Sequence, residues 1–205
     1  MSGYIGNAPT AVPLTSADIA DGIITSAKIA DGSIVNADIN ASAAIASTKL
    51  SGVVSGLTEA DLWRVTANKS DNTDITANLE RDDTSGFGYV GTGMTQSSGI
   101  FTFPSTGYYL VTATFVFIVT TDALVIGSIN TTINNSSYTL RAEAFGQSNG
   151  TNNYSNGSTS IIFDVTSTAN CKVKFSLSNF SAGSEIQAGT SLNYTHFSFI
   201  RLGDT

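Results

Sequence analysis

Apolar and polar side chains alternate along much of the chain from about Thr58 to Thr205. The clearest run is residues 109–119, where every second residue from Tyr109 to Val119 is apolar, and residues 161–165 and 171–177 repeat the pattern. A period of two predicts half-buried β-strands. Turns rich in Gly, Asn and Ser separate these runs. Many short strands with polar turns predict an antiparallel β-sandwich over residues 58–205.

A second pattern lies upstream, where a large apolar residue recurs at every fifth position. The phase slips by one at Ala44/Ile45 and resumes at Leu50. A helix repeats its face every 3.6 residues and a strand every two, so neither explains a step of five. Asp21-Gly22 and Asp31-Gly32 are turn signals, so we expect a segment that turns regularly. We call residues 15–50 the repeat segment.

The repeat segment is too short to bury a core by itself. We therefore expect neighbouring chains to complete it, as a trimeric shaft, and the alternatives are a lone solenoid or a disordered linker. The predicted shaft core consists of the recurring large residues Ile19, Ile24, Ile29, Ile34, Ile39 and Leu50.

These patterns divide the chain into three parts. Residues 1–14 hold two of the three prolines and are predicted to be an extended docking peptide, anchored by Tyr4, Ile5 and Val12, or else a flexible tail. Residues 15–57 form the shaft and a Ser-Gly-rich joint, and residues 58–205 form the head. Only Thr58 to Leu62 suggests a helix, one turn with Thr58 as its cap.

Composition narrows the function classes. The chain has 205 residues, of which 41% are hydrophobic and 12% charged, with a net charge of −7 and no basic run. Nucleic-acid binding and attachment to anionic lipid are therefore disfavoured. No apolar stretch is long enough for a membrane span, and no signal peptide is expected. The single cysteine, Cys171, is expected to be a buried small hydrophobe.

Catalytic chemistry has little support in the sequence. His196 is the only histidine, and no Gly-rich phosphate-binding loop precedes an expected helix, so we expect a packed or interface histidine and no enzyme. We also expect no cofactor and no metal. The acidic pair Asp82-Asp83 is interpreted as solvated loop charge, because calcium requires six or more oxygen ligands. Whether any calcium is bound stays open.

The segment Gly99-Ile-Phe-Thr-Phe-Pro-Ser-Thr-Gly-Tyr-Tyr-Leu110 resembles the core motif of the complement globular-head and tumour-necrosis-factor-like jelly rolls. Residues 62–67 are similar to the first strand of those domains, and residues 186–192 and 197–200 to the last two. The resemblance implies a jelly-roll head that trimerises about an axis lined by apolar side chains. Here Tyr108, Leu110, Val116 and Ile118 form a second apolar face opposite the core row. A trimer interface would cover it, or else a second sheet or long loop of the same chain.

Residues 24–34, ITSAKIADGSI, resemble repeats of phage fibre proteins, and the period of five also resembles the pentapeptide-repeat family. The phage resemblance implies a virion protein: a homotrimeric tail fibre that binds other virion proteins through its N-terminus and a host receptor or glycan through its head. The alternatives are a head fibre or capsid decoration protein, and a secreted cell-surface binding module. Candidate receptor contacts lie in polar turns: Tyr138, Arg141, Asn149, Asn152, Asn153 and Tyr154.

Overall fold

The computed structural model describes residues 15–40, 42–45, 49–50, 56–82, 84–148, 153–181 and 183–205. The chain divides into two compact units, Met1–Val53 and Val54–Thr205. The predicted docking residues Tyr4, Ile5 and Val12 lie outside the described residues. Within the described part of the chain, no helix has the length and apolar character needed to cross a membrane.

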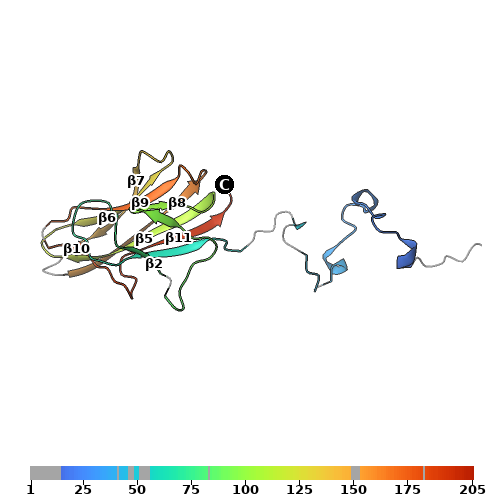
Figure 1. Cartoon of the computed structure of the whole chain (residues 1–205), viewed down its shortest axis with the longest axis horizontal. Helices are drawn as coiled ribbons and strands as arrows, with labels where there is room; N and C mark the ends of the chain where they lie inside the picture. The colour runs from blue at the N-terminus through green and yellow to red at the C-terminus, as the bar shows by residue number, and fades with distance from the viewer. Residues whose placement is uncertain are drawn as a thin grey trace, which may run out of the picture. The chain divides into compact units, whose positions relative to one another are not determined.

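The second unit, the head, is a sandwich of two antiparallel β-sheets (Figure 1). In the six-stranded sheet the order is β10-β5-β11-β1-β2, and β8 pairs with β5. In the five-stranded sheet the order is β3-β4-β9-β6-β7. The strands are β1 (Ala60–Val65), β2 (Leu79–Arg81), β3 (Thr95–Ser97), β4 (Ile100–Thr102), β5 (Gly107–Val119), β6 (Val125–Thr132), β7 (Thr139–Gly146), β8 (Asn153–Val165), β9 (Lys172–Ser178), β10 (Glu185–Ile186) and β11 (His196–Gly203). The expected mainly β antiparallel sandwich is confirmed.

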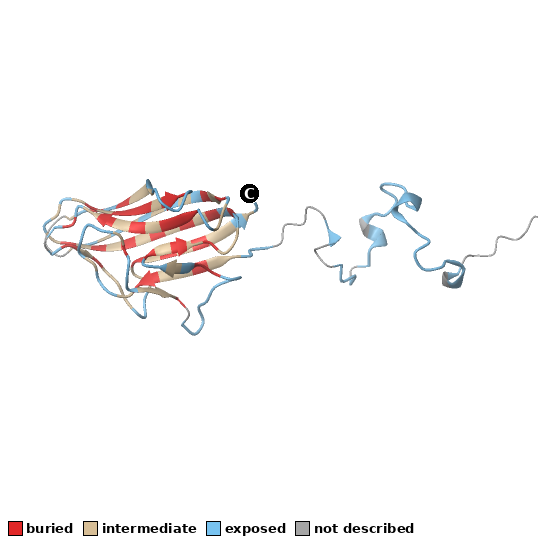
Figure 2. Cartoon of the chain, turned by 45° about the horizontal axis from the view of Figure 1, so that its top comes forward, coloured by how far each residue is buried: buried red, intermediate tan, exposed pale blue. Residues whose placement is uncertain are grey.

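The core lies between the two sheets and is built largely of phenylalanine. Buried and less buried positions alternate along β5 as its sequence predicts, which Figure 2 shows as bands along the strands. Phe175 of β9 stacks on Phe197 of β11, with ring centroids 3.6 Å apart and planes 4° apart, so the two sheets interlock at this point. Gly127 of β6 leaves room for a ring, because an added Cβ would lie 2.6 Å from Phe115. Cys171 is buried, as expected.

The predicted helical turn at Thr58–Leu62 is wrong. Strand β1 spans Ala60–Val65 and pairs with β11, with Ala60 opposite Ile200. Pairing with a strand distant in sequence overrides the local capping signal.

The repeat segment does turn at regular intervals. Three 3₁₀ turns, η1 (Ser16–Asp18), η2 (Ser26–Lys28) and η3 (Asn36–Asp38), recur every ten residues. Between them, Gly22 and Gly32 have φ of 75° and 76° in turns closed by backbone hydrogen bonds from Ile23 to Ala20 and from Ser33 to Ala30. Positive φ at the third turn position favours glycine. The five-residue period thus arises from two kinds of turn that alternate.

Candidate functional site

The outward face of the six-stranded sheet carries apolar side chains. Across β5 and β8 the register sets Leu110 opposite Ile162 and Ile118 opposite Tyr154. Ile162 and Tyr154 are each 67% exposed, although both belong to strand β8 of the six-stranded sheet. Large apolar groups this exposed on one face of a sheet mark an interaction surface. No segment of the described head covers them, which disfavours cover by the same chain.

A polar band divides this outward face into two apolar ends. It includes Thr112, opposite Ser160, and Thr114, which lies between Ser158 and His196 on its two neighbouring strands. The Nδ1 atom of His196 lies 3.0 Å from the carbonyl oxygen of Asn193. This contact orients the imidazole within its own chain, on the outward face of the sheet.

Asp164 adds an unsatisfied group to the same face. It lies opposite Tyr108, and its Oδ1 atom is shielded from solvent without a hydrogen-bond partner among the described residues. A buried carboxylate oxygen without a donor is costly.

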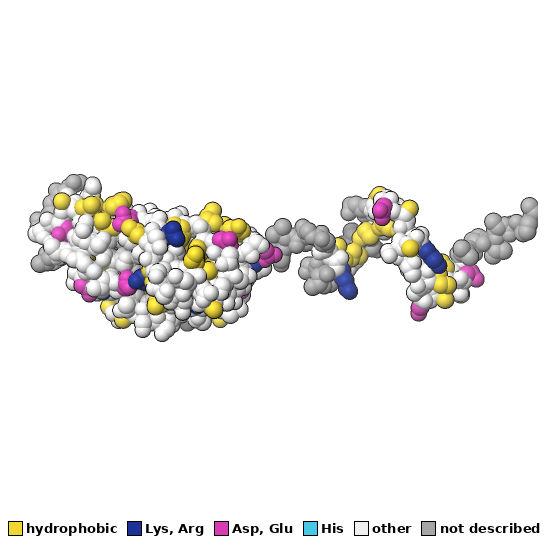
Figure 3. All heavy atoms as spheres, turned by 90° about the horizontal axis from the view of Figure 1, so that it is seen from above, with side chains coloured by type: hydrophobic (Ala, Val, Ile, Leu, Met, Phe, Trp, Pro, Cys, Tyr) yellow, Lys and Arg dark blue, Asp and Glu magenta, His cyan; other side chains and the backbone are white. Residues whose placement is uncertain are grey.

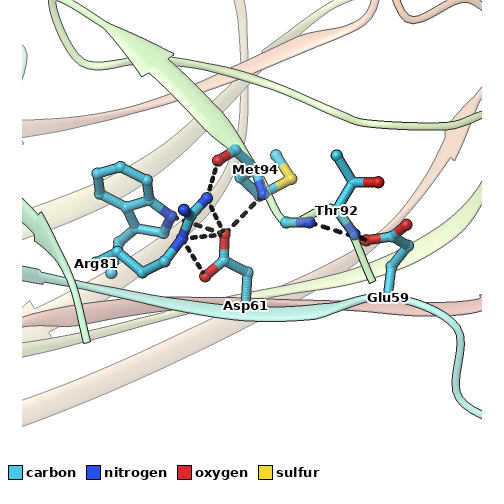
Figure 4. Close-up of polar contacts among 7 residues, drawn as sticks. Glu59, Asp61, Arg81, Thr92 and Met94 are labelled. Carbon is cyan, nitrogen blue, oxygen red and sulfur yellow. Dashed lines mark hydrogen bonds and ion pairs between the residues drawn. The ribbon is translucent and has the colours of Figure 1, made fainter. Parts of the chain in front are cut away.

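A polar network on β1 fixes the loop that precedes β3 (Figure 4). The carboxylate of Asp61 accepts hydrogen bonds from Arg81 Nε (3.0 Å), Trp63 Nε1 (2.9 Å) and the backbone N–H of Met94 (2.6 Å). The Arg81 guanidinium also lies 5.0 Å from the centroid of the Trp63 ring. Glu59 accepts from the backbone N–H of Thr92 at 2.9 Å. Each contact is internal to the head, so the network is structural.

A second buried network corrects the interpretation of Asp82. This carboxylate is 2% exposed and pairs with Arg64 at 3.2 Å, and Asn193 donates to it at 2.6 Å. Glu80 pairs with the same arginine at 2.8 Å. Asp82 is therefore a buried ion-pair partner rather than a solvated loop charge. The reason is that the guanidinium of Arg64 is itself buried and requires a counter-ion. Asp83 lies outside the described residues.

The predicted shaft residues are all exposed in the single chain. The exposed fraction ranges from 40% for Ile29 to 55% for Ile34. Where the repeat segment is described, Figure 2 draws it as exposed, and Figure 3 shows hydrophobic side chains on its surface. Asp18 accepts from the backbone N–H of Thr15 at 2.8 Å, and this hydrogen bond lowers the pKa of Asp18. The turns are thus held by local bonds, while the isoleucines lack contacts that bury them.

The candidate receptor residues do not form one site. Tyr138 and Arg141 lie at the start of β7, whereas Asn153 and Tyr154 lie beyond its other end, at the start of β8. The length of β7 separates the two pairs by more than about 20 Å. Asn149 and Asn152 lie outside the described residues.

The four described candidates have different surroundings. Tyr138 packs under the ammonium of Lys174, 4.5 Å from its ring centroid, and burial raises the pKa of its hydroxyl. Arg141 donates to Thr131 Oγ1 at 3.0 Å. Tyr154 belongs to the outward apolar face rather than to a turn. Among the described residues, no group of three or more His, Cys, Asp or Glu side chains is placed to hold a metal ion.

No family model matches the chain, and no curated protein matches it. Solved structures do. The Eiger TNF of S. frugiperda superposes with a TM-score of 0.56 at 11% identity, covering 73% of this chain and 95% of that one. Murine APRIL at pH 5.0 superposes with a TM-score of 0.55 at 12% identity, covering 70% of this chain and 98% of that one. The head therefore shares the jelly-roll fold of tumour-necrosis-factor-like proteins.

Proposed function

We propose that the chain is a homotrimeric attachment protein of the fibre type, in which the head binds a cell-surface receptor and the repeat segment forms a three-chain shaft. The observation that carries the proposal is the exposed outward face of β5 and β8, where Ile162 and Tyr154 lack cover. The tumour-necrosis-factor-like fold supports it, since the resemblance implies a trimer about an apolar axis.

The repeat segment supports the same assembly by a separate route. Its isoleucines recur with the turns but stay exposed in one chain. Three copies side by side would bury these rows together, which is how repeat units that lack a core of their own gain stability.

We further propose that the particle that carries this trimer is a phage virion and that the protein is not an enzyme. The phage assignment rests on the ITSAKIADGSI repeat of residues 24–34. Three heads on each fibre, and many fibres on each particle, would bind a surface receptor with high avidity even where each contact is weak.

Gold-labelled antibody against the head, applied to purified particles from the producing strain, tests this assignment. Label at the tail, together with inhibition of adsorption by the free trimer, is the expected result. Label on the capsid without inhibition would replace attachment by a decoration role. Absence of label from the particles would contradict the virion assignment.

A further inference from the structure

The loop between β1 and β2 lines a cavity of about 270 Å³ that is open to solvent. Pockets that bury drug-sized molecules measure about 300–1,000 Å³, so this one suits a ligand of about one ring. The lining is mostly polar, with one positive and one negative side chain: Val65, Ala67, Asn68, Lys69, Ser70, Asp71, Thr76, Ala77 and Asn78.

We propose that this loop cavity binds a neutral sugar ring with adjacent free hydroxyl groups, such as a terminal residue of a cell-surface polysaccharide. The inference rests on the proposed attachment function and names its ligand class. It places recognition in a loop separate from the turn residues singled out in the sequence.

The charged pair at the cavity has hydrogen-bonding capacity to spare. Lys69 Nζ donates to Asp71 Oδ1 at 2.5 Å and to Thr73 Oγ1 at 2.9 Å, which leaves one ammonium proton. The Asp71 side chain is 61% exposed, and a carboxylate can accept several bonds. Hydroxyl groups both donate and accept, so two adjacent hydroxyls can accept from Lys69 and donate to Asp71.

The lining disfavours other classes of small ligand. Asp71 beside Lys69 would repel a phosphate or carboxylate, and the Lys69 hydrogen bond lowers the pKa of Asp71, which keeps it ionised at neutral pH. The exposed apolar part consists of the small side chains of Ala67 and Ala77, which suit the C–H face of a sugar but offer little to a large apolar ligand.

The loop that forms the cavity is anchored at both sheets. On the six-stranded sheet, the Ile186 N–H donates to the Lys69 carbonyl at 2.9 Å. On the other sheet, the Ile75 N–H donates to the Phe175 carbonyl at 2.8 Å, and the Ile75 side chain is buried. A loop fixed in this way loses little conformational entropy when it binds a ligand.

The position of the cavity suits contact with a surface. Strand β1 enters the head at Ala60 and reaches the cavity at Val65. Lys69 bridges to β10, which pairs with the far end of β5 at Phe117. In Figure 1, β10 lies at the end of the sandwich opposite the C-terminus. The cavity therefore opens at the end of the head remote from Ala60, where a fibre head would meet its receptor.

Saturation-transfer-difference NMR of the full-length protein tests the site, with the methyl glycosides of glucose, galactose, mannose and N-acetylglucosamine as probes. We expect at least one to give a signal, and its per-O-methylated derivative to give none. Lys69→Met and Asp71→Asn should each weaken binding about fivefold, as expected for one lost hydrogen bond. Asp71→Asn keeps the side-chain shape, so it remains informative if Lys69→Met is unstable.

Lys174→Met is the matched control. Lys174, on β9, forms an ion pair at 2.7 Å with Asp74 of the same loop, and neither residue lines the cavity. It should leave binding unchanged. The site is overturned if no glycoside binds, if Lys174→Met weakens binding as much as Lys69→Met, or if the methylated sugar binds equally well. If the antibody labels the particles and the free trimer blocks adsorption, but the protein binds no glycoside, the sugar site alone is overturned. A glycoside-binding protein absent from particles overturns the virion assignment alone.

Discussion

The head and the repeat segment both place apolar residues at regular intervals, but only the head buries them. Phe175 and Phe197 stack between two sheets of one chain, whereas Ile29 and Ile34 are exposed on local turns. A strand can turn one face toward a second sheet of its own chain, and a short series of turns has no such partner. This difference supports the proposal that neighbouring chains complete the repeat segment.

The largest expected effect comes from the head core. Phe197→Ala should lower the free energy of unfolding by about 3–5 kcal/mol, because it removes a fully buried ring between the sheets. Urea denaturation followed by intrinsic fluorescence measures it.

Ile29→Asp, by contrast, should destabilise the repeat segment and change the unfolding free energy of the head by less than about 0.5 kcal/mol. Loss of head strand structure in Ile29→Asp would contradict the division into two units.

Breaking the Asp61 network should have the next largest effect. Arg81→Met leaves the Asp61 side chain, which is 2% exposed, without its counter-ion. A buried charge that loses its partner costs about 3 kcal/mol or more. Lys174→Met breaks a more exposed pair with Asp74 and should cost at most about 1 kcal/mol. Equal losses in the two variants, measured by urea denaturation, would show that the Asp61 network is not a structural anchor.

A smaller effect on stability, but a large one on assembly, is expected from the outward sheet face. Ile162→Asp changes an exposed residue, so the head should keep its fold, yet a charge in the proposed interface should dissociate the trimer. Leu140→Asp, at a residue 50% exposed on the other sheet, is the matched control and should stay trimeric. Light scattering measures the molar mass, and so the oligomeric state, of both variants. Dissociation of Leu140→Asp alone would move the interface to the five-stranded sheet.

The smallest effect is a pH dependence. Hydrogen bonds from Ser181 lower the pKa of Asp122 below its ordinary value of 3.8. A lowered pKa in the folded state adds stability above about pH 4, and that stability is lost as the pH falls through the folded-state value. Asp122→Ala should therefore flatten the decline of the melting temperature between pH 4 and 2 by a small amount, because the group is near the surface. A steeper acid decline in the variant would contradict the assigned direction.

The sequence predicts the long strands well because alternation is a local signal. Residues 109–119 match β5 except at its first two positions, and Cys171 is buried as its neighbours imply. The short β1 is less predictable, since Thr58 and Glu59 also suit a helix start and only pairing with β11 decides the outcome.

The buried polar networks and the candidate surfaces depend on contacts distant in sequence. Arg81 meets Asp61 twenty residues away, and Arg64 meets Asp82 eighteen residues away, which requires the register of β1 and β2. Tyr138 and Asn153 both lie in polar segments that the sequence predicts to be turns. Strand β7 lies between them, so they are at opposite ends of that strand. Asn78, which lines the loop cavity, has a φ of 57°, which the alternation of apolar and polar residues does not predict.

The mass of the full-length protein in solution tests the central claim most directly. Size-exclusion chromatography with multi-angle light scattering should give about 64 kDa, three times the 21.3 kDa of one chain. That mass should persist on dilution, as expected of an assembly that buries both the sheet face and the isoleucine rows. A stable species of 21.3 kDa would contradict the account, because neither apolar surface would then have a partner.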